Sequence, residues 1–176
     1  MNKKNYIKFA KQSVSTQINE LKKIKKIFNQ SFVKAVDLIL SCKGKVIFAG
    51  IGKSGLIARK ISATFSSVGI PSFFCDPAQA LHGDMGQIEK KDILIIFSYS
   101  GNTEELTNML KYANRFRIKV IGVASKPDSV LLKASDIKLI LPKVKEADVT
   151  GMVPTSSTSI TMLLGDSLAT TVMHQK

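Results

Sequence analysis

The segment Ser98-Tyr-Ser-Gly-Asn-Thr-Glu-Glu105 has the residue types of an anion-binding loop. It follows the apolar run 92–97, which is typical of a strand buried on both faces. Thr103 is expected to cap a helix, with both glutamates in its first turn. Backbone N–H groups at a helix start, together with hydroxyls and a glycine that allows close approach, bind anions such as phosphate. A carboxylate beside such a loop indicates sugar-phosphate chemistry.

Alternating strands and helices must position this loop. Short apolar runs predict five strands, over 45–49, 72–75, 93–97, 119–123 and 137–141. Helical spacing predicts helices over 3–30, 31–41, 54–68, 103–116 and 129–134, and a last helix from 156 or 157 to 173. This alternation predicts a parallel sheet with helices on both faces. Ligands of such sheets bind at the carboxyl ends of the strands, so one site is expected from the loops 50–55, 76–86, 98–103 and 142–157.

The glycine-rich turn Gly50-Ile-Gly-Lys-Ser-Gly55 allows several readings. It matches the dinucleotide-binding fingerprint, with Asp76 about 20 residues further on. Alternatively, Gly50 and Gly52 form the turn, Ser54 caps the following helix, and Lys53 points its ammonium into the site. A purely structural strand-to-helix turn also fits, because glycine-rich turns are common between elements.

Two further loops at this edge of the predicted sheet carry titratable side chains. His82, in a loop with two glycines, has a pKa suited to relaying a proton and also suits a sugar hydroxyl, or it satisfies a surface turn. Glu146 fits either a general base or a solvated loop carboxylate. The hydroxyls of Thr155-Ser-Ser-Thr158 fit an anion site or a helix cap.

The composition favours one globular domain. The chain has 176 residues, 44% of them hydrophobic, and a net charge of +13. Residues 1–45 hold 11 lysines and 2 acidic residues, but the lysines interleave with apolar residues at helical spacing, which favours a solvated helix face over nucleic-acid binding. No apolar run approaches the roughly 20 residues of a membrane span, and no apolar signal core is seen, so a cytoplasmic protein is expected. Cys42 and Cys75 have neither disulfide-framework nor metal-ligand spacing.

Several motifs, in the same order along nearly the whole chain, resemble the sugar-isomerase (SIS) domain family of bacterial D-arabinose 5-phosphate isomerases. They are Gly50-Ile-Gly-Lys-Ser-Gly55, Pro71-Ser-Phe-Phe74, His82-Gly-Asp84, Ser98-Tyr-Ser-Gly101 and Pro154-Thr-Ser-Ser-Thr158 with Gly165-Asp166. The resemblance implies a three-layer α-β-α fold with a five-stranded, flavodoxin-like parallel sheet over 41–176. N-terminal helices over 1–40 are expected to pack on that domain.

The resemblance also implies an activity and an assembly. The reaction interconverts D-ribulose 5-phosphate and D-arabinose 5-phosphate, which supplies Kdo for lipopolysaccharide. No metal or organic cofactor is implied, and neither is a nucleic-acid or membrane partner. The implied assembly is a homotetramer with sites at subunit interfaces.

The catalytic residues implied by the resemblance are Lys53, the carboxylates Glu105 and Glu146, and His82 at the sugar end. A carboxylate base and a cation that stabilises the enediolate suit aldose–ketose isomerisation. The phosphate is expected near Gly52, Ser54, Ser98, Ser100, Gly101, Asn102, Thr103, Thr155, Ser156, Ser157 and Thr158.

The sequence departs from the family's pattern after the last helix. Family members continue into a His-Pro-Gly-Gly segment and commonly a pair of CBS domains, and this sequence contains neither. The second hypothesis is therefore a non-catalytic sugar-phosphate-binding module on the same fold. A dinucleotide-binding domain is the third.

Overall fold

A five-stranded parallel sheet organises the chain in the computed structural model, which describes residues 4–176. Its strand order is β2-β1-β3-β4-β5, as in flavodoxin-like folds. The strands are β1 (Val46–Gly50), β2 (Ser72–Phe74), β3 (Ile93–Phe97), β4 (Lys119–Ala124) and β5 (Ile137–Ile140). β1 and β3 are buried along their whole length, as their continuous apolar runs predict.

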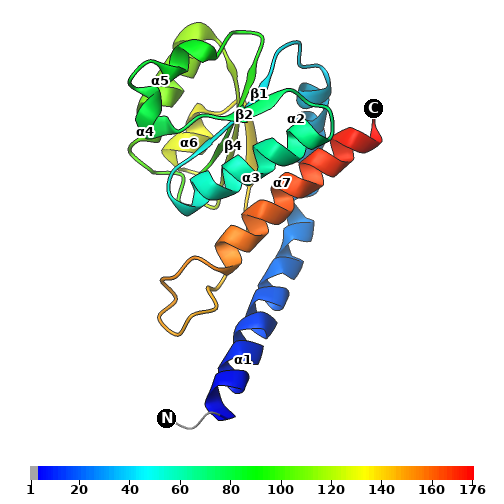
Figure 1. Ribbon diagram of the computed structural model, residues 1–176, viewed down its shortest axis with the longest axis vertical. Helices are drawn as coiled ribbons and strands as arrows, with labels where there is room; N and C mark the ends of the chain where they lie inside the picture. The colour runs from blue at the N-terminus through cyan, green and yellow to red at the C-terminus, as the bar shows by residue number, and fades with distance from the viewer. Residues whose placement is uncertain (1–3) are drawn as a thin grey trace.

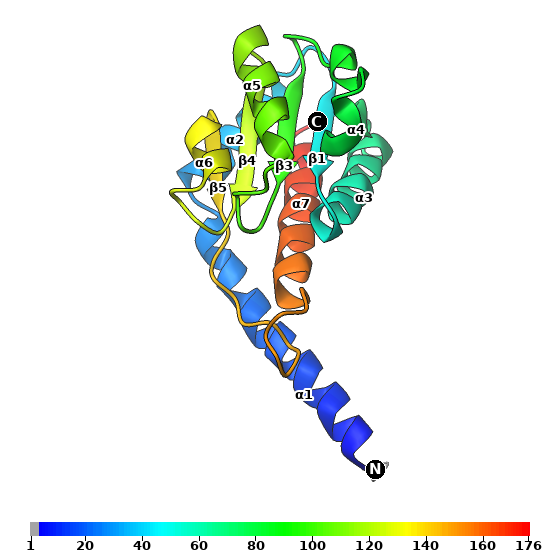
Figure 2. The same cartoon turned by 90° about the vertical axis from the view of Figure 1, so that its left-hand side faces the viewer.

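Helices cover both faces of the sheet and complete the predicted three layers (Figures 1 and 2). One face is covered by α2 (Gln30–Leu40), α3 (Lys53–Ser67) and α7 (Ser156–His174). The other carries α4 (Pro77–Ala80), α5 (Leu106–Phe116) and α6 (Val130–Ala134). Alternate strand residues point to opposite faces, so Phe48 packs with the first set and Ile47 with the second. The predicted fold class is confirmed.

The single long helix expected over 3–30 is wrong within the described residues. α1 (Lys4–Leu21) is followed by a 3-10 helix, η1 (Lys22–Ile27), and the chain turns before α2. Ile24 and Ile27 are both buried, and their spacing of three suits a three-residue turn. Asn29 then caps α2, because its side chain accepts a hydrogen bond of 2.8 Å from the Ser31 N–H. The 76–86 loop also differs, since it contains α4 and η2 (Asp84–Gln87).

The N-terminal half of α1 extends away from the sheet, past the start of α7 (Figures 1 and 2). Only its later turns pack on α7. The projecting part exposes about half or more of the side chains of Tyr6, Ile7 and Phe9, and Val14 and Ile18 are equally exposed further along α1. An apolar stripe of this kind marks a surface suited to a protein partner.

Candidate active site

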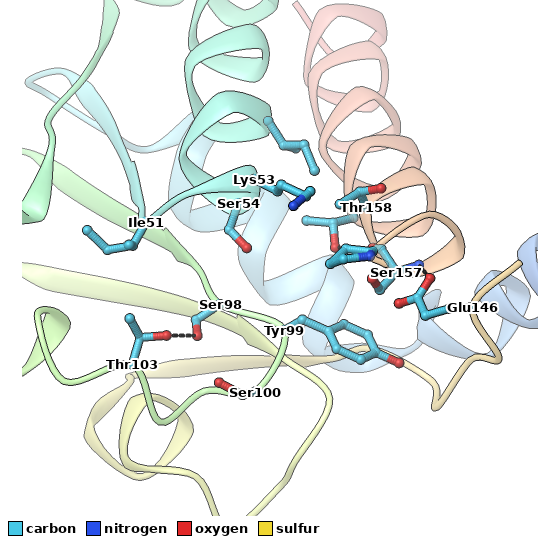
Figure 3. A pocket seen from close by; sticks show the side chains of 13 residues that line it. Ile51, Lys53, Ser54, Ser98, Tyr99, Ser100, Thr103, Glu146, Ser157 and Thr158 are labelled. Carbon is cyan, nitrogen blue, oxygen red and sulfur yellow. Dashed lines mark hydrogen bonds between the residues drawn. The ribbon is translucent and has the colours of Figure 1, made fainter. Parts of the chain in front are cut away.

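Three loops at the carboxyl edge of the sheet enclose a polar pocket of about 360 Å³. They follow β1, β3 and β5, and the pocket lies where the strand order reverses between β1 and β3 (Figure 3). The loop after β2, which was expected to contribute, adds no residue to the wall. The wall consists of Ile51, Lys53, Ser54, Ile57, Ser98, Tyr99, Ser100, Thr103, Glu146, Pro154, Ser157, Thr158 and Thr161.

Close packing explains the glycines of the turn between β1 and α3. A Cβ on Gly50 would lie 2.9 Å from the Phe97 carbonyl oxygen, and one on Gly55 would lie 2.6 Å from that of Gly50. Gly52, at φ 57°, is the N-cap residue of α3, and no side chain caps the helix there. Ser54 is therefore the second residue of α3 and not its cap, as the sequence had suggested. Within the described residues the backbone N–H groups at the start of α3 have no side-chain cap, and the Ser54 hydroxyl lies beside them on the pocket wall.

Lys53 supplies the positive charge of the pocket. Its side chain extends from the start of α3 into the space between that helix and α7 (Figure 3). Within residues 4–176 its ammonium forms no ion pair, unlike that of Lys60 on the same helix, which pairs with Asp166. An ammonium without an acidic partner is available to an anionic ligand.

The loop after β3 is fixed on α6. The Ser98 hydroxyl lies 2.8 Å from that of Thr103 and accepts a hydrogen bond of 3.1 Å from the Gly101 N–H. Gly101 has φ 69°, and a Cβ there would lie 2.2 Å from the Ser129 hydroxyl. Asn102 accepts a hydrogen bond of 3.0 Å from the backbone N–H at the start of α6. Gly101 and Asn102 thus hold the loop in place and are not on the pocket wall.

The helix after this loop begins later than expected. α5 starts at Leu106 with Glu105 as its N-cap residue, so Thr103 is not the cap and neither glutamate is in the first turn. The Thr103 hydroxyl bonds to Ser98 instead, and its carbonyl oxygen accepts the Leu106 N–H at 3.3 Å. The Glu105 side chain is consequently exposed and lies off the pocket wall.

Glu146 caps α7 from the loop after β5. Its Oε2 accepts hydrogen bonds from the N–H of Thr155 (2.8 Å) and of Ser157 (3.3 Å), and from the Thr155 hydroxyl (3.0 Å). The N-cap residue itself is Thr155, so the expectation of a Ser156 or Ser157 cap is wrong. Burial would raise the pKa of the Glu146 carboxyl, but hydrogen bonds from Ser157 and Thr155 outweigh it and lower the pKa. Glu146 is therefore an ionised carboxylate at neutral pH.

His82 lies apart from the pocket. It follows α4, and its backbone N–H donates a hydrogen bond of 2.9 Å to the Gln79 carbonyl oxygen. Its side chain is exposed and does not line the pocket. Ser156 is fully buried and its hydroxyl lacks a hydrogen-bond partner within the described residues.

The structure brings eight of the predicted site residues to the pocket wall: Lys53, Ser54, Ser98, Ser100, Thr103, Glu146, Ser157 and Thr158. Those off the wall are Gly52, His82, Gly101, Asn102, Glu105, Thr155 and Ser156.

Sequence reasoning missed several wall residues, of which Tyr99 has a clear structural role. Its hydroxyl accepts a hydrogen bond from the Val144 N–H (3.0 Å) and donates one to the Pro142 carbonyl oxygen (3.3 Å). Burial raises the pKa of Tyr99. Ile57 and Thr161 could have been found, because each lies four residues after a predicted site residue on the same helix face.

In residues 4–176, no group of three or more His, Cys, Asp or Glu side chains is arranged to hold a metal ion. No helix in that range has the length and apolar character needed to cross a membrane. Both cysteines are free thiols, and burial together with Asp84 and Asp76 raises the pKa of Cys75 to about 11.

The fold and the pocket define a flavodoxin-like α/β protein with a pocket at the switch point of its sheet. The chain belongs to the SIS-domain family, whose model matches residues 39–171. It is 41% identical over 176 residues to uncharacterized protein RP505 of Rickettsia prowazekii, covering all of this chain and 54% of that one. It is 38% identical over 167 residues to arabinose 5-phosphate isomerase KdsD of Escherichia coli K12, covering 95% of this chain and 51% of that one.

A solved structure extends the comparison. The c3406 protein of E. coli CFT073, in complex with arabinose 5-phosphate, superposes with a TM-score of 0.95 at 32% identity, covering 99% of this chain and 93% of that one. The chain spans about half the length of the curated relatives it matches.

Proposed function

We propose that the protein is an aldose–ketose isomerase that interconverts D-ribulose 5-phosphate and D-arabinose 5-phosphate. The observation that carries this proposal is one pocket holding an uncapped helix start, several hydroxyls, a lysine without an ion pair among the described residues and an ionised carboxylate. The 38% identity to arabinose 5-phosphate isomerase KdsD and the likeness to a structure in complex with arabinose 5-phosphate support the same substrate.

The phosphate end of the substrate is proposed to bind between α3 and the loop after β3. The start of α3 carries the positive end of a helix dipole, and the hydroxyls of Ser54, Ser98, Ser100 and Thr103 face the same pocket. A sugar phosphate held there is oriented for proton transfer at its carbonyl end.

Glu146 is proposed as the base, with Glu105 as the alternative. In the forward direction the carboxylate removes a proton from C1 of ribulose 5-phosphate, and the electron pair forms the C1–C2 enediolate. The Lys53 ammonium stabilises the developing charge on the substrate oxygen. The proton returns at C2, while the C1 hydroxyl loses its proton to the C2 oxygen, so C1 becomes the aldehyde. No external oxidant or reductant is consumed.

His82 and Glu105 are proposed to complete the site through self-association. Both are exposed in the single chain and lie off the pocket wall. Helix α1 exposes apolar side chains along its length, from Tyr6 to Ile18, and these suit a second copy of the chain. We therefore propose a cytoplasmic homotetramer that forms arabinose 5-phosphate for Kdo and lipopolysaccharide synthesis. Analytical ultracentrifugation tests the assembly, and a monomer at micromolar concentration would contradict it.

The function is tested by following both pentose phosphates by NMR with the purified protein. We expect turnover in both directions without added cofactor, and loss of turnover in Lys53→Met. Folded protein that does not turn over but is stabilised against heat by arabinose 5-phosphate would identify a binding module instead. Stabilisation by NAD alone would identify a dinucleotide-binding domain.

A further inference from the structure

Helix α1 is joined by hydrogen bonds to the loop that carries Glu146. The Glu20 carboxylate, in the last turn of α1, accepts a hydrogen bond of 2.9 Å from the backbone N–H of Lys145. Lys23 supports the contact, because its ammonium pairs with Glu20 and lies 3.4 Å from the Lys143 carbonyl oxygen. Glu20 thus binds the residue directly before Glu146.

A second side chain holds the same loop from the loop after β3. The Tyr99 hydroxyl accepts a hydrogen bond of 3.0 Å from the Val144 N–H. Two successive N–H groups, those of Val144 and Lys145, are therefore fixed by side chains from two different elements. The position of this part of the loop therefore depends on both contacts. Glu20 supplies one contact and Tyr99 the other.

A cavity between α1 and the loop gives the Glu20 contact a role in holding the loop in place. Glu146 lines the pocket, but it also lines a second cavity of about 530 Å³ between α1 and the loop. The loop from 142 to 155 contains no helix or strand of its own. Without the Glu20 contact, the backbone at Lys145 has room to move toward α1 and to draw the Glu146 carboxylate away from the pocket.

We propose that Glu20 is a positioning residue for Glu146, so that α1 is part of the catalytic unit. The assignment rests on the proposed isomerase function. It adds a residue outside 39–171, the range that matches the SIS-domain family. The Glu20 side chain is 14% exposed, and its hydrogen bond to Lys145 lies at the surface of the molecule.

Kinetics with three Glu20 variants test the proposal. In Glu20→Ala we expect kcat to fall about 10- to 100-fold, which is the effect of a misplaced catalytic group. KM should change less than about twofold, because the proposed phosphate-binding residues of α3 and the loop after β3 are unchanged. Glu20→Gln keeps an acceptor oxygen for the Lys145 N–H and should restore most of kcat. Glu20→Asp keeps the charge but shortens the side chain, so it should resemble the alanine variant. Wild-type kcat in folded Glu20→Ala would overturn the proposal.

Glu89→Ala is the matched control. Glu89 is also an ion-paired carboxylate, bound to Lys91 at 3.0 Å and Lys45 at 3.6 Å, but it precedes β3 at the opposite edge of the sheet. Its kcat should equal that of the wild type. An equal fall in both alanine variants would show a general effect of charge and contradict a role specific to Glu20.

Hydrogen exchange gives a test that needs no turnover. We expect the peptide covering 143–147 to exchange faster in Glu20→Ala than in the wild type, and at the wild-type rate in Glu20→Gln and Glu89→Ala. If the wild type does not isomerise pentose phosphates, the proposed function fails and this measurement still decides the positioning. Unchanged exchange in both Glu20→Ala and Glu20→Asp would overturn it.

Discussion

The two walls of the pocket are built in different ways. The wall formed by the turns after β1 and β3 is held by close packing around the backbone, with Gly50, Gly55 and Gly101 at positions where a Cβ would meet neighbouring atoms within 3 Å. Hydrogen bonds of the Ser98 and Asn102 side chains add to this packing. The wall formed by the loop after β5 is held by side chains, above all those of Glu20, Tyr99 and Glu146. Backbone packing leaves almost no freedom, whereas a loop held by a few hydrogen bonds can adjust.

This difference matches a division of tasks. The rigid wall carries the helix start and most of the hydroxyls that suit a phosphate, which must be held in one place. The adjustable wall carries Glu146, the carboxylate proposed to move a proton between two neighbouring carbons. Lys53 extends from the rigid wall toward the adjustable one (Figure 3). Substitutions in the two walls should therefore have different consequences.

The largest effect is expected where the two walls meet, at Lys53. Lys53→Met removes the ammonium proposed to stabilise the enediolate, so kcat/KM should fall about 100- to 1,000-fold. The free energy of unfolding should change little, because this exposed side chain forms no ion pair within the described residues. Steady-state kinetics and urea unfolding measure both quantities. Lys60→Met on the same helix is the control, and a comparable loss there would remove Lys53 from the mechanism.

The next largest effect is a difference in stability loss between a glycine in a closely packed turn and a glycine in an open loop. Gly101→Ala combines φ 69° with a Cβ placed 2.2 Å from the Ser129 hydroxyl, so we expect it to cost more than about 2 kcal/mol of stability. Gly151→Ala, in the loop after β5, also has positive φ (68°) but open space around the new Cβ, and should cost about 1 kcal/mol. Urea denaturation gives both values. Equal losses would show that the two walls are equally adaptable.

Sequence reasoning found the rigid wall more completely than the adjustable one. Buried apolar runs and glycine turns are local signals, and they located β1, β3 and the turns that follow them. The helix starts were misplaced for a physical reason, since caps were assigned to nearby hydroxyls such as Ser54 and Thr103. The N-terminus of α7 is instead satisfied by Glu146, nine residues before Thr155. The Glu20 contact spans 125 positions, so no local pattern indicates it.

A smaller effect is expected from single hydroxyls on the rigid wall. Ser100→Ala removes one proposed hydrogen bond to phosphate, worth about 1 kcal/mol, so KM should rise about 3- to 10-fold with kcat nearly unchanged. Ser67→Ala on α3 is the control, because its hydroxyl bonds only within that helix, to Ala63. A fall in kcat without a change in KM would place Ser100 at the reacting end of the sugar.

The smallest effect concerns stability and depends on pH. Glu146→Ala removes a helix-capping carboxylate and should cost about 1 kcal/mol at pH 7. The folded-state pKa of Glu146 is lowered, so its contribution is present above the unfolded-state pKa and is lost as pH falls through the folded-state value. The stability difference between wild type and variant should therefore shrink below about pH 4.5, the ordinary glutamate pKa. Urea unfolding from pH 7 to pH 3 measures it. A difference that stays constant over this range would mean that the uncharged carboxyl caps α7 equally well.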